Sequence, residues 1–276
     1  MSEQGTPSSN TFTRLDEVGV WQAARNSYKL PHPNVSLQLI KLVCKVLAHS
    51  FEVLRKQGKD LEDLSEDEIT AELMEYIENT VLKANGNPAM GGIPGFTNIF
   101  FRSVTRQSNA RSYNQFKIRP SPDLWFQLNY NERSFVLPSY DALLVECKIV
   151  DATSNRSAGK WYCDNGMIRF VEGDYAWAMQ EGIMLAYARN QKTIQGDLIP
   201  AMAEPDRVVR LKTLSQPMPV SSKALAAYCP EPLHASMHER GFEYLENKGT
   251  APPISIYHLW LPCSGDTHEE AVKKSV

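Results

Sequence analysis

The sequence has no apolar run that approaches the roughly 20 residues a helix needs to cross a bilayer. It also has no large excess of charge, because 29 Lys and Arg stand against 32 Asp and Glu, for a net charge of -3. A protein without a global basic surface can hold nucleic acid only through a local one. The N-terminus has neither a basic start nor an apolar stretch, so we expect no secretory signal and no membrane partner.

Cysteines are few and odd in number, which is a poor basis for a disulfide framework. We expect reduced thiols in a cytoplasmic protein, most of them small buried hydrophobes. The five cysteines are Cys44, Cys147, Cys163, Cys229 and Cys263.

The glycine-rich stretch 86–95 lacks the Gly-Lys-Ser/Thr ending of a P-loop and the preceding strand of a dinucleotide site. We interpret it as a flexible loop that folds over substrate.

Two histidines four residues apart, His234 and His238, would share one face of a helix, as zinc ligands often do. Cys229 lies close in sequence, but no fourth ligand stands at a useful spacing. We therefore interpret both histidines as surface or phosphate-facing residues. His258 lies in an apolar segment and is most simply a hydrogen-bonded histidine on a strand.

Apolar residues at helical spacing predict a helix over residues 35–57. Ser65-Glu66-Asp67-Glu68 has the form of a capping box, which predicts a second helix from Ser65 to the stop signal Asn85-Gly86. Many small residues between Asp174 and Arg189 predict a third helix packed closely on a sheet. Strands are expected at 115–118, 123–128, 143–150, 208–211 and 254–261.

This order of elements predicts a mixed α/β or α+β fold. The length of 276 residues and the hydrophobic content of 42% suit a single large domain. We expect that domain over residues 13–263, between a loose N-terminus (1–12) and a charged tail (264–276).

The stretch Leu143-Leu-Val-Glu-Cys-Lys-Ile-Val150 reads as a central strand, because both of its faces are largely apolar. Alternation places Glu146 and Lys148 on the same face. Charges on a buried strand are costly without partners, and a divalent cation would supply one for Glu146. The alternative is a salt-bridged pair on a half-exposed strand, worth about 0–1 kcal/mol.

A cation at Glu146 needs a second carboxylate, and two aspartates compete for that role. Asp141 is five residues away, or about 16 Å if both lie on one straight strand. Asp123 begins the preceding strand, and an antiparallel return through 129–133 would lay it beside Glu146. We prefer Asp123 and keep Asp141 as the second choice, in case the chain bends sharply at Pro138-Ser139.

Pro122-Asp123, followed by Glu146-Cys147-Lys148, resembles the PD-(D/E)xK nuclease superfamily. The resemblance covers roughly residues 65–190. It implies a restriction-endonuclease-like mixed sheet flanked by helices, with extra elements at both ends of the chain. It also implies that Asp123, Glu146 and the backbone carbonyl of Cys147 bind Mg²⁺ or Mn²⁺, and that Lys148 assists the attacking water.

Members of this superfamily often add a glutamate from the preceding helix, for which Glu72, Glu75 and Glu78 are candidates and Glu75 is our choice. A polar residue on the following helix often completes the site. Tyr175 and Gln180 are candidates for that position.

A basic segment points independently to a nucleic-acid partner. No acidic residue occurs from Asn79 to Pro122, so this part of an acidic protein forms a local positive field leading into the strand of Asp123. An ordinary solvated loop is the alternative. Arg169 extends the patch towards the last predicted helix. The expected nucleic-acid-binding residues are Arg102, Arg106, Arg111, Lys117, Arg119 and Arg169.

The sequence thus predicts a Mg²⁺- or Mn²⁺-dependent endonuclease acting on DNA, double-stranded in the first place, with RNA a weaker candidate. Family analogy suggests restriction or antiviral defence with a protein partner. The rival is a non-catalytic nucleic-acid-binding or scaffold subunit that keeps the nuclease fold. A hydrolase of a small phosphorylated metabolite is a third candidate.

Overall fold

The computed structural model describes residues 28–58, 60–106, 109–111, 118–129, 136–220 and 232–264. Within these residues, seven strands form one mixed sheet in the order β1-β4-β5-β6-β9-β8-β7, and β2 and β3 form a small separate ribbon. The strands are β1 Phe101–Thr105, β2 Asn109–Arg111, β3 Ile118–Pro120, β4 Leu124–Leu128, β5 Ala142–Val150, β6 Glu181–Ala188, β7 Thr213–Pro219, β8 His234–His238 and β9 Ile254–Pro262.

The sheet is parallel in its centre and antiparallel at both ends. β1, β4 and β5 form an antiparallel series, β5 and β9 run parallel to β6 on either side, and β8 and β7 return antiparallel. The expected mixed α/β architecture is therefore confirmed, and a helical crossover joins the parallel strands β5 and β6.

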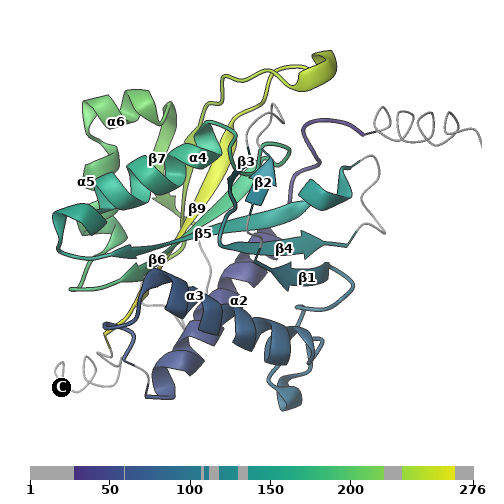
Figure 1. Ribbon diagram of the computed structural model, residues 1–276, viewed down its shortest axis with the longest axis vertical. Coiled ribbons are helices and arrows are strands. Elements are labelled where there is room, and N and C mark those ends of the chain that lie inside the picture. Colours follow the sequence, from purple (N-terminus) through teal and green to yellow (C-terminus); the bar gives the residue numbers. More distant parts are fainter. Residues whose placement is uncertain are drawn as a thin grey trace, which may run out of the picture.

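Helical segments cover both faces of the sheet (Figure 1). α2 and α3 lie on one side, and α4, α5 and α6 lie on the other. The segments are α2 Leu37–Lys56, α3 Glu66–Tyr76, η1 Ile77–Leu82, η2 Pro88–Met90, η4 Pro138–Tyr140, η5 Ser154–Arg156, η6 Ala158–Met167, α4 Ile168–Val171, η7 Ile194–Leu198, α5 Ile199–Met202, α6 Pro205–Arg210 and η8 Leu245–Asn247. None of the helices in the described ranges combines the length and hydropathy of a bilayer-spanning segment.

The two N-terminal helices begin where the sequence predicts. The Ser36 hydroxyl caps α2, and Ser65 and Glu68 form a reciprocal capping box at the start of α3. Two donors that the first helical turn would leave unpaired are satisfied in that box. The chain leaves the second helix through left-handed Asn85 and Gly86, as expected.

Two expected elements are wrong. The segment predicted as a helix over 174–189 is a turn followed by β6, whose eight residues are all buried. The small residue Gly182 instead allows α4 to pack closely on this strand, because a Cβ at Gly182 would lie 2.6 Å from the Phe170 ring of α4. The strand predicted at 208–211 is instead mostly α6, which begins at Pro205, a residue suited to the first turn of a helix.

Other expectations are met in part. β4, β5 and β9 are confirmed, whereas residues 115–117 of the expected first strand lie outside the described ranges and Ile118 begins β3. Four cysteines are buried, as expected, and Cys229 lies outside the described ranges.

Among the residues that the structure describes, the apolar core consists of two clusters. The large cluster joins the sheet to the helices on both of its faces. The small cluster contains Trp177, Ala178, Phe242, Tyr244 and Ala251, with Leu30, Leu137 and Tyr140 packed against it. We call them the main core and the minor core. Each buries its own apolar surface, and such burial contributes about 25 cal/mol per Å².

Candidate active site

Strand pairing brings Asp123 beside Glu146. β4 and β5 are antiparallel, with Leu124 opposite Val145, so the residue before Leu124 stands next to the residue after Val145. Asp123 Oδ2 accepts a hydrogen bond from the Cys147 backbone N–H at 2.7 Å. The structure thus places Asp123 beside Glu146, in the position that a second ligand would need.

Glu146 and Lys148 share one buried face of β5, as the alternation predicts. The Lys148 Nζ lies 2.9 Å from Glu146 Oε1 and also donates to the Cys147 carbonyl at 2.7 Å. Glu146 is 2% exposed and Lys148 is 5% exposed. These values rule out the half-exposed surface pair, so each charge depends on its protein neighbours.

Glu66, which the sequence analysis did not select, completes the surroundings of Lys148. Its Oε1 lies 2.9 Å from the Lys148 Nζ, and its Oε2 accepts from Ile149 N at 2.8 Å and from Trp161 Nε1 at 3.0 Å. Glu66 occupies the first turn of α3, where the helix dipole favours a carboxylate.

A glutamate of the preceding helix does contact Lys148, but it is Glu66 rather than Glu75. Glu75 lies on the same helix, but its side chain is exposed on the outer surface. The only sequence signal for Glu66 is its place in the acidic first turn of a helix that precedes the site. That signal does not distinguish it from Asp67 or Glu68.

Arg169 and Tyr175 approach Glu146 from the crossover helix and the turn that follows it. The Arg169 Nη1 lies 3.4 Å from Glu146 Oε1 and donates to the Tyr175 hydroxyl. The Arg169 guanidinium also lies over the Tyr175 ring, 5.3 Å from its centroid. About one third of the Arg169 side chain is exposed, so a solvent-borne anion can reach it.

Gln180 and Asp141 do not join this cluster. Gln180 donates to the His32 carbonyl at 2.8 Å and to Asn34 Oδ1 at 2.7 Å, because the helix that would have carried it inward is a turn. Asp141 is fully buried, with its Oδ1 3.4 Å from His32 Nδ1. Its carbonyl accepts from Leu128 N at 3.0 Å and so continues the ladder between β4 and β5, and the ideal strand rise puts it about 16 Å from Glu146.

The basic segment is divided between the site and the surface. Arg106 donates to Asp67 Oδ1 at 3.0 Å on the first turn of α3, and its charge acts on the pKa of Asp123. Arg102 is exposed and donates to Gln127 Oε1 at 2.6 Å. Arg111 and Arg119 belong to the β2–β3 ribbon, and Lys117 lies outside the described ranges.

Burial dominates the electrostatics of the cluster. Burial and, to a smaller extent, the charge of nearby Asp123 raise the pKa of Glu146 to about 7, against the attraction of Lys148. Burial also raises the pKa of Asp123, again against the attraction of Lys148. Burial alone would lower the pKa of Lys148, but Glu146, Glu66 and Asp123 together raise it. Lys148 is therefore a permanent cation between carboxylates that are costly to ionise.

The donor set fits a hard divalent cation. Within the described ranges, no three His, Cys, Asp or Glu side chains gather as a metal cage. Mg²⁺ does not require one, since it keeps several waters and takes one or two carboxylates. Asp123, Glu146 and the Cys147 carbonyl are such oxygen donors, and a cation would stabilise the ionised form of both acids, whose pKa burial raises.

His234 and His238, which were predicted to face the surface, are instead buried on β8, whereas His258 is a hydrogen-bonded histidine on the strand β9, as expected. His238 Nδ1 is 2.8 Å from the Leu211 carbonyl, and its Nε2 is 2.8 Å from Ser236 Oγ. The same hydroxyl lies 2.8 Å from His258 Nε2, and the Tyr162 hydroxyl lies 3.0 Å from His258 Nδ1. His234 and His238 share a face of a strand rather than of a helix, and these ring nitrogens already have partners.

Comparison of the chain with protein-family models, with curated proteins and with solved structures finds no match.

Proposed function

We propose that this protein is a metal-dependent nuclease with a restriction-endonuclease-like core over about residues 65–190. The observation that carries the proposal is the convergence of Asp123, Glu146 and Lys148 on one end of the β4–β5 pair. The order of elements supports it, because a helix, three antiparallel strands, a helical crossover and a parallel strand follow one another.

Asp123, Glu146 and the Cys147 carbonyl would hold Mg²⁺ or Mn²⁺, which supplies Lewis-acid polarisation of a phosphate oxygen when bound. Lys148 places a fixed positive charge where negative charge develops on the scissile phosphate. Glu66 orients that ammonium through its contact at 2.9 Å. Arg169 offers a second, partly exposed donor for the phosphate.

The substrate class follows from charge. An anionic polymer would meet Arg169 and Arg106 on its way to the carboxylates, and the basic segment leads into Asp123. Binding should therefore weaken steeply with salt. We propose DNA as the first substrate to test, and by analogy with the superfamily we propose a role in defence against invading DNA.

The test is incubation with supercoiled plasmid, with Mn²⁺ or Mg²⁺ and with EDTA. Wild type should nick or linearise the plasmid only with the metal, and Lys148→Ala should lose that activity. Lys248→Ala is the matched control, because Lys248 ends a second Glu-x-Lys triplet and contacts Tyr28, far in sequence from the site. Equal cleavage by wild type and Lys148→Ala would reject the assignment.

One observation favours a second candidate, a nucleic-acid-binding subunit without catalysis. Glu146 Oε1 is in contact with both Lys148 and Arg169, so this carboxylate is neutralised by the protein alone. In that case duplex DNA should bind to wild type and to Glu146→Gln with Lys148→Ala equally well, and no metal should promote cleavage.

A further inference from the structure

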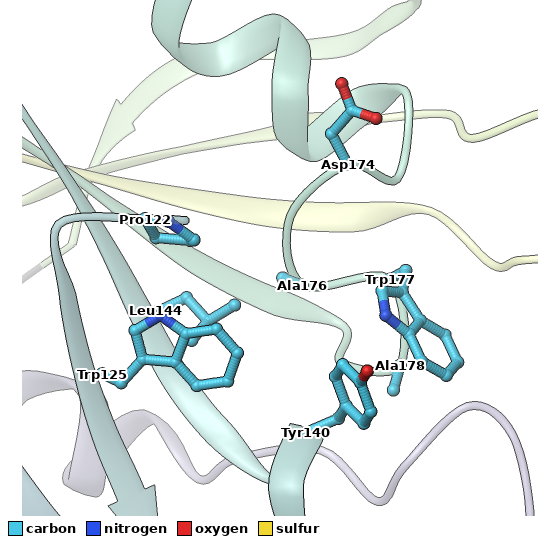
Figure 2. Close-up of a pocket in the computed structure, with 8 residues that line it drawn as sticks. All are labelled: Pro122, Trp125, Tyr140, Leu144, Asp174, Ala176, Trp177 and Ala178. Carbon is cyan, nitrogen blue, oxygen red and sulfur yellow. The ribbon is translucent and has the colours of Figure 1, made fainter. Parts of the chain in front are cut away.

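The face of β5 that carries Glu146 and Lys148 has an apolar end and a polar end. Leu144 lies at the apolar end and is 4% exposed. Figure 2 shows it beside the aromatic side chains of Trp125, Tyr140 and Trp177. Lys148 lies at the other end of the face, where α3 and η6 supply its partners.

The carboxylate of Glu66 is bound to the backbone at the edge of β5. β4 pairs with residues 142–145 of β5, and beyond them side chains bind the backbone N–H groups on that edge. Asp123 accepts from Cys147 N at 2.7 Å, and Glu66 Oε2 accepts from Ile149 N at 2.8 Å. A buried N–H without an acceptor would be costly. This hydrogen bond therefore fixes one oxygen of Glu66 against the strand.

Trp161 of η6 binds the same oxygen of Glu66. The indole Nε1 donates to Glu66 Oε2 at 3.0 Å, so this oxygen has two neutral donors. Two donors on one oxygen restrict the rotation of the carboxylate. The other oxygen, Oε1, then faces the Lys148 Nζ at 2.9 Å. The indole N–H thus acts on the position of the ammonium through Glu66.

The ring of Trp161 also contacts the ammonium directly. The Lys148 Nζ lies over the indole, 5.3 Å from its centroid. A cation is attracted to the face of an indole ring, most strongly where water is excluded, and Lys148 is 5% exposed. Gly166 lets η6 approach, because a Cβ there would lie 3.6 Å from Lys148 Cγ and 2.6 Å from Met184 Cε.

We propose that Trp161 is a positioning residue of the nuclease reaction, whose N–H acts through Glu66 and whose ring acts directly on Lys148. The inference rests on the proposed function. The two contacts can be separated by substitution. Trp161→Phe keeps an aromatic ring but removes the N–H donor, whereas Trp161→Leu removes both. Trp161 is only half-buried, so neither variant empties a fully buried position.

The first readout is the rate of plasmid nicking with Mn²⁺ at saturating protein. Trp161→Leu should nick about 10- to 100-fold more slowly than wild type, the range for loss of a residue that orients a group of a metal site. The rate of Trp161→Phe should lie between the two. Adding Trp161→Phe to Glu66→Gln should slow nicking little further, because the N–H acts through Glu66. DNA affinity, measured by fluorescence anisotropy in EDTA, should not change.

The second readout is the ¹⁵N–H signal of the Lys148 ammonium in an NMR spectrum of ¹⁵N-lysine-labelled protein, identified by its loss in Lys148→Ala. A buried ammonium that is held by fixed acceptors exchanges its protons slowly with water, so wild type should show this signal. Trp161→Leu should lose it. Trp260→Phe is the matched control and should keep both signal and nicking rate, because the Trp260 ring lies in the main core, 5.4 Å from that of Tyr162.

The proposal is overturned if folded Trp161→Leu nicks plasmid at the wild-type rate or keeps the Lys148 signal. Trp161→Phe, which retains a ring, carries the same test if Trp161→Leu does not fold. Wild type that does not nick plasmid would refute the proposed function. The NMR signal would still show whether Trp161 holds Lys148 in place, so the two failures are distinguishable.

Discussion

Acid should destabilise this protein through the buried pair His238 and His258, and His238→Asn should remove part of that effect. The Leu211 carbonyl can only accept, so His238 Nδ1 carries a proton and its Nε2 accepts from Ser236. The Ser236 oxygen in turn accepts from His258 Nε2. A second proton on His238 would turn its Nε2 into a donor and so remove the acceptor of the Ser236 hydroxyl hydrogen.

The magnitude follows from the pKa. Burial lowers the pKa of His238 to about 4, against only the hydrogen bond to Leu211, from an ordinary value of 6.5. The unfolded chain therefore binds a proton first as the pH falls. Stability is unaffected above pH 6.5 and decreases by about 1.4 kcal/mol per pH unit between 6.5 and 4. The loss from His238 alone is about 3 kcal/mol, and His258, whose pKa is also lowered by burial, adds to it.

The assay is urea unfolding of wild type and His238→Asn at pH 7.5, 6.0, 5.0 and 4.5. Asparagine can keep a donor to Leu211 but does not titrate. The variant should be less stable at pH 7.5, because it leaves a cavity. The difference should narrow by roughly 2–3 kcal/mol at pH 4.5. A difference that stays constant across this range would show that His238 is not held neutral in the folded state.

Three further outcomes are expected. Glu66→Gln should reduce metal-dependent plasmid cleavage about 10- to 100-fold, because Glu66 orients Lys148. DNA affinity, measured by fluorescence anisotropy, should not change. Cleavage equal to that of wild type would contradict this role of Glu66. Arg169→Ala should lower the slope of log affinity against log salt by about 1, and an unchanged slope would show no phosphate contact. Gly182→Ala should lower the free energy of unfolding in urea by about 1–3 kcal/mol, because the added Cβ would overlap the Phe170 ring. Adding Phe170→Leu to this variant should restore part of the lost stability. An unchanged free energy of unfolding for Gly182→Ala would contradict this packing.

Sequence patterns were reliable where neighbours along the chain decide the outcome. The capping box at Ser65 and Glu68 forms within one helical turn, and the alternation of Glu146 and Lys148 follows from the strand itself. They failed at β6, whose small residues suit a helix as well as a buried parallel strand. Burial on both faces removes the alternation that would have distinguished the two.

The same limit applies to the site. Asp123 could be chosen because an antiparallel hairpin is a local return of the chain, and the register then brings it to Glu146. Glu66 lies 82 residues from Lys148 in sequence, and no spacing rule connects them. Gln180 was chosen for a helix that does not exist, whereas Tyr175 in the turn reaches Arg169.

The sequence by itself determined the central apolar strand, the two acids and one lysine on it and beside it, and the start of the helix that covers it. Those features depend on hydrogen bonds and side-chain alternation between close neighbours. Only the tertiary structure decided which helix carboxylate meets Lys148 and that His234 and His238 are buried. Such contacts depend on strand order and on how separate apolar clusters pack, which are properties of the whole chain.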